Sequence, residues 1–172
     1  MVAVIGDGDG DGDGTDDLAV AAPEWAAVDG VPASGRVYVA LGGLALPEDA
    51  SLADAHLVLS GASGDRAGAD LAGGDLDADR VADLAVGVPG SDLGGDAAGR
   101  VDWLGGPVLA GGGHVDLATG ADIRWTGTRG QGLGEAVTHV ADLDGDGTTE
   151  LAVAGSEPDG SDVAVLLVQI PE

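Results

Sequence analysis

The chain has 172 residues, of which 31 are acidic and six are basic, and its formal net charge at pH 7 is -25. Such a charge repels phosphate backbones and anionic lipids, which excludes nucleic-acid binding. No run approaches the ~20 apolar residues that a membrane-spanning helix needs, so we expect no membrane insertion. The absence of cysteine excludes disulfides and thiolate metal sites. Because this charge opposes compaction unless cations neutralise it or salt screens it, we expect bound cations.

Short apolar runs, bounded by Gly, Pro, Ser and Asp, predict strands along the whole chain, and no stretch has a convincing helical period. The chain contains 33 glycines and no phenylalanine, so the core of this all-β protein must be built from Ala, Val and Leu. In chain order the expected strands are 1–6, 18–22, 36–41, 56–60, 69–74, 84–88, 100–104, 123–126, 135–141, 151–154 and 163–170.

One acidic string occurs three times, beginning at Asp9, Asp75 and Asp142, which are 66 and 67 residues apart. Each string runs directly into Leu-Ala-Val. The match extends beyond the acidic residues, since Gly-Arg-Val occurs at both 35–37 and 99–101. The chain is therefore a single domain of three units: 1–66, 67–132 and a truncated third unit at 133–172.

Four antiparallel strands in each period predict the blades of a β-propeller. About three four-stranded blades are expected, the last of them incomplete. A β-solenoid is the alternative, but its coils of ~20 to 30 residues would give a shorter period. Propellers close with 4 to 8 blades, so we expect either a part of a longer propeller or two copies that complete a six-bladed ring.

Oxygen-bearing side chains stand at positions 1, 3, 5 and 9 of every acidic string. They are Asp9, Asp11, Asp13, Asp17, Asp75, Asp77, Asp79, Asp83, Asp142, Asp144, Asp146 and Glu150. Position 7, which is Thr15, Val81 or Thr148, adds a main-chain carbonyl. Hard oxygen donors without His or Cys favour Ca²⁺ over Zn²⁺, so up to three calcium ions are predicted.

Two other interpretations of these strings are disfavoured. An EF-hand loop needs a bidentate Glu at position 12 and flanking helices, whereas position 12 is Val20, Val86 and Val153 in strand-like runs. A solvated low-complexity segment could explain the Asp-Gly run at 7–14 alone. It does not explain three copies at one period, each followed by the same strand.

An acidic loop that closes at position 9 and runs into Leu-Ala-Val and a Gly-Ala-Pro-like turn resembles the FG-GAP repeats of the integrin alpha-chain propeller. The resemblance spans essentially the whole chain and implies Ca²⁺ in a loop between the first two strands of each blade, held by the positions named above. The Phe-Gly half of the motif departs from the family, since it is Gly68-Ala69 in the second unit and Leu133-Gly134 in the third.

The second loop departs from the other two at position 6, where Arg80 replaces Gly14 and Gly147. A residue other than glycine at positive φ costs about 1 kcal/mol or more. We therefore predict that the second calcium site is the weakest.

The common catalytic signatures are absent from the sequence, so we expect no enzymatic activity. His56, His114 and His139 are expected to be structural or surface residues. The predicted role is structural, adhesive or interactive, with a protein or glycan as ligand; the alternative is an accessory or glycan-binding domain of a larger secreted enzyme. An extracellular or cell-surface location is expected, with any export signal outside this sequence.

Overall fold

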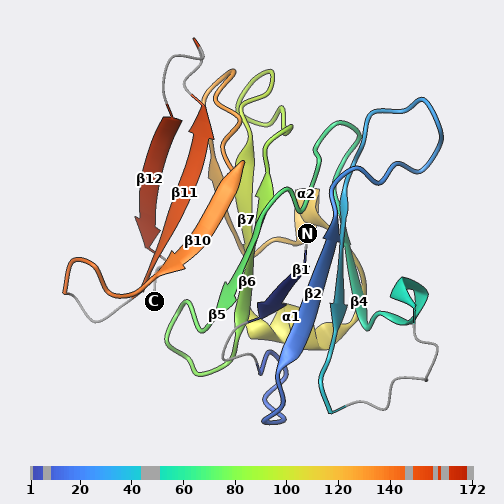
Figure 1. Ribbon diagram of the computed structural model, residues 1–172, viewed down its shortest axis with the longest axis vertical. Coiled ribbons are helices and arrows are strands. Elements are labelled where there is room, and N and C mark those ends of the chain that lie inside the picture. Colours follow the sequence, from blue (N-terminus) through green and yellow to red (C-terminus); the bar gives the residue numbers. More distant parts are fainter. Residues whose placement is uncertain are drawn as a thin grey trace.

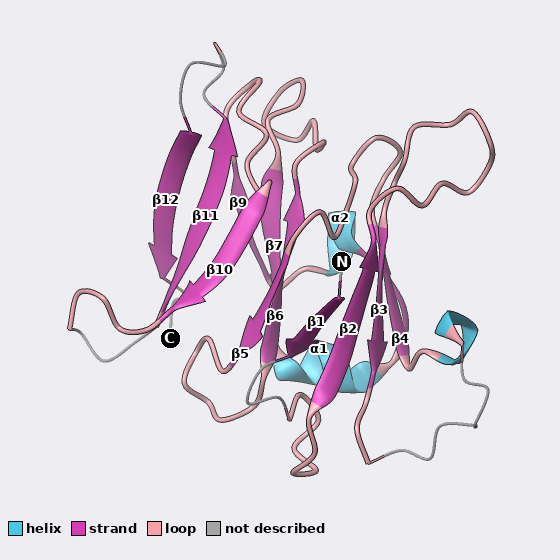
Figure 2. Ribbon diagram, in the orientation of Figure 1, coloured by secondary structure: helices cyan, strands magenta, loops and turns pink. Residues whose placement is uncertain are grey.

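The structure is a computed structural model that describes residues 2–5, 9–43, 51–145, 149–156, 159 and 163–169. Strands dominate it, and the helices are short (Figure 2). The strands are β1 (Val2–Ile5), β2 (Asp17–Ala22), β3 (Arg36–Ala40), β4 (Leu57–Ser60), β5 (Leu71–Gly74), β6 (Asp83–Val88), β7 (Arg100–Leu104), β8 (Gly113–Asp116), β9 (Ile123–Thr126), β10 (Ala136–Val140), β11 (Glu150–Ser156) and β12 (Val163–Gln169). The helices are the 3-10 helix η1 (Leu52–Asp54), α1 (Gly106–Gly111) and α2 (Leu117–Gly120). None of the described helices is long and apolar enough to cross a membrane.

Three sheets contain the described strands. The first sheet has the order β1-β2-β3-β4-β8, the second β5-β6-β7-β9 and the third β10-β11-β12. All neighbouring strands are antiparallel except β4 and β8, which are parallel. Figure 1 shows the second sheet between the other two. The fold is therefore all-β, as the sequence predicts.

The eleven strands expected from the sequence are all present, and their described ends lie within two residues of the expected ones. Residues 1, 6 and 170, which the sequence placed at strand ends, lie outside the described residues. The hydrophobic alternation identifies these strands because each sheet buries one face or both, so an apolar side chain recurs at every second position.

The segment between β7 and β9 contradicts two of the expectations. It forms α1 and α2, although no helix was expected, and β8, which joins the first sheet as a fifth strand. Burial explains the helices, because Leu109 and Leu117 are fully buried in the core. Gly112, at φ 67°, turns the chain from α1 into β8, where a Cβ atom would lie 2.7 Å from the His56 ring. Only glycine fits this turn without displacing that ring.

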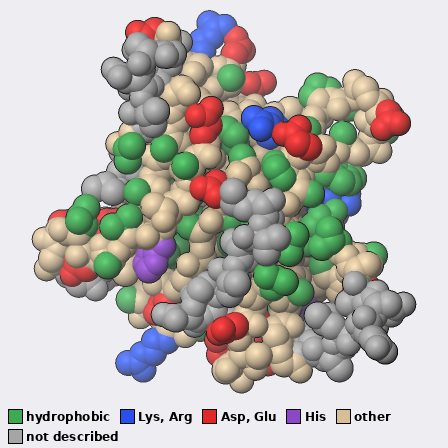
Figure 3. Space-filling view, in the orientation of Figure 1, with side chains coloured by type: hydrophobic (Ala, Val, Ile, Leu, Met, Phe, Trp, Pro, Cys, Tyr) green, Lys and Arg blue, Asp and Glu red, His purple; other side chains and the backbone are tan. Residues whose placement is uncertain are grey.

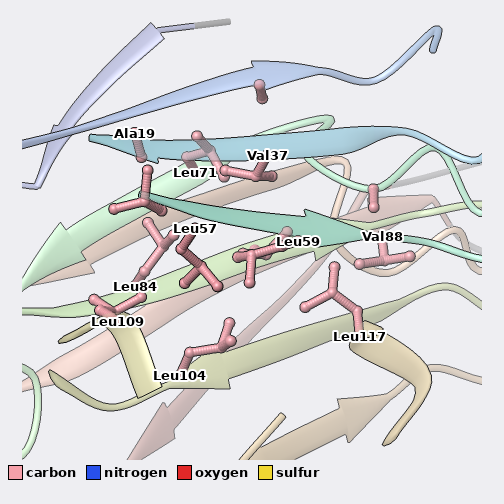
Figure 4. Packing of buried hydrophobic residues seen from close by; sticks show 14 of the residues in the cluster. Ala19, Val37, Leu57, Leu59, Leu71, Leu84, Val88, Leu104, Leu109 and Leu117 are labelled. Atoms are coloured by element: carbon pink, nitrogen blue, oxygen red, sulfur yellow. The ribbon is translucent and has the colours of Figure 1, made fainter. Parts of the chain in front are cut away.

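One buried cluster fills the space between the first and second sheets (Figure 4). The second sheet contributes Leu84 and Val86 of β6, and the first sheet contributes Ala19 of β2 and Val37 of β3. Leu57 and Leu59 of β4 add large buried side chains from the first sheet, so both faces contribute to one packed core.

A second buried cluster lies between the second and third sheets. Ala85 of β6 meets Leu151 and Val153 of β11 there. Every residue of β6 and β7 is consequently buried, whereas the first and third sheets each bury one face. Strand β5 contacts both β1 and β10, so the first strands of the three sheets are neighbours.

Candidate metal centres

Three acidic loops join the first strand of each sheet to its second strand: β1 to β2, β5 to β6 and β10 to β11. Figure 1 shows β1, β5 and β10 running in the same direction, so the loops lie at the same end of the three sheets. The closing carboxylates Asp17, Asp83 and Glu150 are the first residues of β2, β6 and β11. Strand pairing therefore fixes where each loop ends.

Each loop brings three acidic side chains together, with one oxygen from each lying within 4.8 Å of the others. The three groups are Asp9, Asp11 and Asp13; Asp75, Asp77 and Asp83; and Asp142, Asp144 and Glu150. Repulsion between carboxylates at this separation favours a bound cation. The clusters could therefore each hold a metal ion.

The structure leaves several predicted ligands outside these three groups. Asp17 and Asp79 have no oxygen in the three-residue clusters, although both lie in the loops concerned. Asp146 and Thr148 lie outside the described residues. Thr15 is exposed and Val81 is half-buried. Carbonyl ligation by these two residues remains a prediction.

In the first two loops a main-chain N–H group donates a hydrogen bond to the carboxylate at position 1. The Gly14 N–H donates to Asp9 Oδ2 at 2.6 Å, and the equivalent Arg80 N–H donates to Asp75 Oδ2 at 3.0 Å. A hydrogen bond between near neighbours also shapes the turn of the first loop, where the N–H of Thr15 donates to Asp13 Oδ1 at 2.8 Å. The two loops therefore share one conformation.

That conformation places positions 4 and 6 in the left-handed region of backbone space. In the first loop these positions are glycines, Gly12 at φ 81° and Gly14 at φ 85°. In the second they are Ala78 at φ 63° and Arg80 at φ 74°. The positive φ predicted for Arg80 is thus confirmed, and Ala78 adds a second strained residue that the sequence analysis missed.

Each closing carboxylate accepts a hydrogen bond from the main-chain N–H at position 2 of its own loop. The donors are Gly10 to Asp17 at 2.8 Å, Leu76 to Asp83 at 2.9 Å, and Leu143 to Glu150 at 2.7 Å. The second oxygen of Asp17 accepts from Gly42, and that of Asp83 accepts from Gly106 at the start of α1. These glycine donors lie far away in sequence, which is why spacing alone did not reveal them.

The pKa of Asp83 is raised to about 7. Burial is the largest cause, the nearby charges of Asp77 and Asp79 also raise the pKa, and the hydrogen bonds from the N–H groups of Leu76 and Gly106 lower it. Burial likewise raises the pKa of Asp17 and of Asp77. A bound cation has the opposite effect, because it stabilises the ionised carboxylates.

Two carboxylate oxygens at these loops are buried without a hydrogen-bond partner in the described structure: Asp75 Oδ1 and Glu150 Oε1. The Glu150 residue is only 4% exposed. A buried charged oxygen without a partner is costly. Both atoms belong to residues of the acidic clusters, so a cation bound there would satisfy them.

The third loop also opens onto a cavity lined by Leu143, Asp144, Glu150 and Gln169. The Gln169 side chain on β12 donates from Nε2 to Asp144 Oδ2 at 3.2 Å. No sequence signal indicated this residue, because the repeat gives it no counterpart in the acidic strings. Strand pairing with Glu150 brings it to the site.

Hydrogen bonds connect the three loops in series. The Ala82 N–H in the second loop donates to the Asp9 carbonyl in the first at 3.1 Å. The Thr149 hydroxyl in the third loop donates to the Leu76 carbonyl in the second at 3.3 Å. Ordering of one loop therefore supports the position of its neighbour.

The histidines lie apart from the acidic groups. His56 lies just before β4, and His114 lies on β8, which pairs with β4. His56 Nε2 contacts the Ala110 carbonyl at 3.0 Å, and His114 Nε2 contacts Ser60 Oγ at 2.8 Å. His139 is exposed on β10. None of the three joins a described acidic cluster.

No protein-family model matches the sequence, and no curated protein matches it. Acidic side chains are spread over the visible face rather than gathered in one patch (Figure 3).

Proposed function

We propose that the chain is a calcium-binding β-propeller module of the FG-GAP type, in which each acidic loop holds one Ca²⁺ at the same end of the stacked sheets. The observation that carries this proposal is the pair of buried, unpartnered oxygens of Asp75 and Glu150 within two of three equivalent acidic clusters. Because the three loops are equivalent and recur at one repeat period, each is expected to bind the same kind of ligand.

The donor chemistry supports calcium over other divalent ions. Carboxylate oxygens on irregular loops suit Ca²⁺, which accepts 6 to 8 oxygens in flexible geometry. Mg²⁺ demands a near-ideal octahedron and keeps several waters, so an all-protein cage of this kind suits it less well. Zn²⁺ favours nitrogen and sulfur ligands, which the clusters lack.

The role of the ion is structural in this proposal. Each Ca²⁺ neutralises a cluster of carboxylates that the fold brings together and fixes the connection between two strands. A carboxylate committed to Ca²⁺ is a poor proton donor, which argues for an interaction or adhesion role rather than catalysis. Extracellular modules bind calcium with Kd values of about 10⁻⁴ to 10⁻³ M, so sites of modest affinity would suit an extracellular or cell-surface protein.

Thermal unfolding of the full chain tests this function. Chelator-treated protein should gain stability in calcium and gain much less in magnesium at the same concentration. Mass action gives about 2.7 kcal/mol for each site at a free calcium concentration of 100 times Kd. One variant per loop, namely Asp13→Asn, Asp75→Asn or Glu150→Gln, should reduce the calcium-dependent rise in Tm.

Asp29→Asn is the matched control, because Asp29 is exposed in the loop between β2 and β3, away from the acidic strings. It should retain the full calcium-dependent rise. Equal Tm values in calcium and chelator for the unmodified chain would overturn the proposal.

A further inference from the structure

Two sheet faces of the molecule remain open at the two ends of the stack. The open face of the first sheet bears a groove lined by Leu18, Val20, Tyr38 and Ala40, and Leu18 is 39% exposed. The open face of the third sheet bears a groove lined by Ala136, Thr138, Ala152, Ala154 and Val165 from its three strands. Asp54 in the first groove and Asp70 in the second are the charged residues among those that line them.

The two interfaces inside the chain are built in the same way. Leu84 and Val86 of the second sheet pack into the cluster that contains Ala19 and Ala21 of the first sheet. One repeat later, Leu151 and Val153 of the third sheet pack into the cluster that contains Ala85 of the second sheet. At both junctions the face that bears the Leu and Val of the Leu-Ala-Val strand packs on the opposite face of the preceding sheet. That opposite face also bears large side chains, namely Val37, Leu57 and Leu59 in the first sheet and Val101 and Trp103 in the second.

The repeat assigns the open faces to the same two types. Leu18 and Val20 occupy the positions of Leu84 and Val86 in the Leu-Ala-Val strand, so the first sheet leaves its Leu/Val face open. Ala152 and Ala154 on β11 occupy the positions of Ala19 and Ala21 on β2, so the third sheet leaves open the face that in the first sheet packs on the second. By this equivalence the two open faces correspond to the two faces that meet at each junction inside the chain.

The second sheet separates these faces within one chain, so they meet only when they belong to different copies. We propose that the open face of the first sheet binds the open face of the third sheet of a second copy of this chain. The contact occurs twice around a two-fold axis and closes a ring of six sheets. This inference rests on the propeller arrangement of the proposed function, but it does not depend on calcium.

An unsatisfied group at the open face of the first sheet supports this docking. Arg36 on β3 occupies the position of Arg100 on β7, which pairs with Asp65 from the preceding unit at 3.0 Å. The Arg36 guanidinium stacks on Trp25 at 3.4 Å, yet its buried Nε has no hydrogen-bond partner in the part of the chain that the structure describes. Among the described residues no other sheet packs on the face that bears Arg36, whereas Arg100 is covered by the first sheet.

Multi-angle light scattering of the full chain tests the dimer. A closed head-to-tail dimer has twice the 16.5 kDa of one chain and does not grow with concentration. Leu18→Glu and Val165→Glu each place a charge on one of the two faces, and either substitution should convert the dimer to a monomer. Leu93→Glu is the control, because Leu93 is 59% exposed on a loop outside both faces; it should remain dimeric. Far-UV circular dichroism checks that every variant is folded.

Mixing the two interface variants provides the decisive comparison. In a head-to-tail ring, a Leu18→Glu chain and a Val165→Glu chain retain one undamaged contact between them, so the mixture should recover a dimer that neither variant forms alone. A contact between two first sheets would leave Val165→Glu dimeric and would give no recovery with Leu18→Glu.

A monomeric unmodified chain, an open-ended polymer, or a dimer insensitive to Val165→Glu would each overturn the inference. The measurements are made both in calcium and in chelator, at about 0.15 M salt so that the net charge is partly screened. A monomer that calcium stabilises would overturn the dimer and leave the proposed function intact. A dimer in both buffers that calcium does not stabilise would support the dimer and overturn the proposed function.

Discussion

Arg100 and Asp65 form an ion pair of 3.0 Å that connects β7 of the second sheet to the turn after β4 of the first. Both side chains are buried, at 1% and 7% exposure. Arg100 also bonds Asp102 at 2.8 Å and the Ser91 hydroxyl, and Asp102 accepts from Arg124. These partners compensate the charges that the fold takes out of water, so the network specifies how the two sheets meet.

Replacing Asp65 with alanine should destabilise the protein by about 3 kcal/mol, because breaking a buried pair leaves one charge uncompensated. Urea unfolding measures this change. Asp96→Ala is the matched control, since the pair of Asp96 with Arg129 is largely exposed; it should change stability by no more than about 0.5 kcal/mol. Equal losses in the two variants would show that the buried network does not hold the sheets together.

Stability of the metal-free protein should fall as pH rises from about 5.5 to 8. The pKa of Asp83 in the folded chain is about 7, above its ordinary value of 3.8. Its contribution to stability is therefore fully present below about pH 4 and is lost as pH rises through 7. Urea unfolding in chelator at several pH values measures the slope, and Asp83→Asn should flatten it.

Calcium should remove most of that slope, because a bound cation keeps the Asp83 carboxylate ionised. The same pH series in saturating calcium makes the comparison. A metal-free protein that gains stability between pH 5.5 and 8 would contradict this interpretation of Asp83.

Arg80→Gly should strengthen the second site and stabilise the chain by about 1 kcal/mol, because glycine adopts φ 74° without strain. Calcium titration and urea unfolding measure the two effects. Arg80→Ala is the control that separates charge from backbone, since it removes the guanidinium and keeps the strain. If Ala and Gly give equal gains, the weakness of the second site comes from charge alone.

The regular part of the fold was predictable from the sequence because it repeats. Strands such as β2, β6 and β11 share Leu-Ala-Val directly after an acidic loop, so three copies confirm one another. The insertion that forms α1, β8 and α2 occurs once, and its structure depends on tertiary contacts. Gly106 and Gly111 at the ends of α1 give no helical signal, and β8 is a strand because it pairs with β4.

The acidic clusters were predictable for the same reason, whereas their surroundings were not. Alternate spacing was enough to indicate that Asp75 and Asp77 converge, and the strand after the loop correctly argued against an EF-hand. The Gly42 and Gly106 donors and the Gln169 side chain reach the sites through strand pairing and the insertion. Contacts of this kind leave no trace in local spacing.

Calorimetric titration of the chelator-treated chain with Ca²⁺ tests whether the three acidic loops bind calcium. We predict about three equivalents of Ca²⁺, with the site at Asp75, Asp77 and Asp83 the weakest. Circular dichroism recorded before and after the titration should show a gain of β structure. The absence of both binding heat and spectral change would contradict this prediction, and the acidic loops would then have no role in calcium binding.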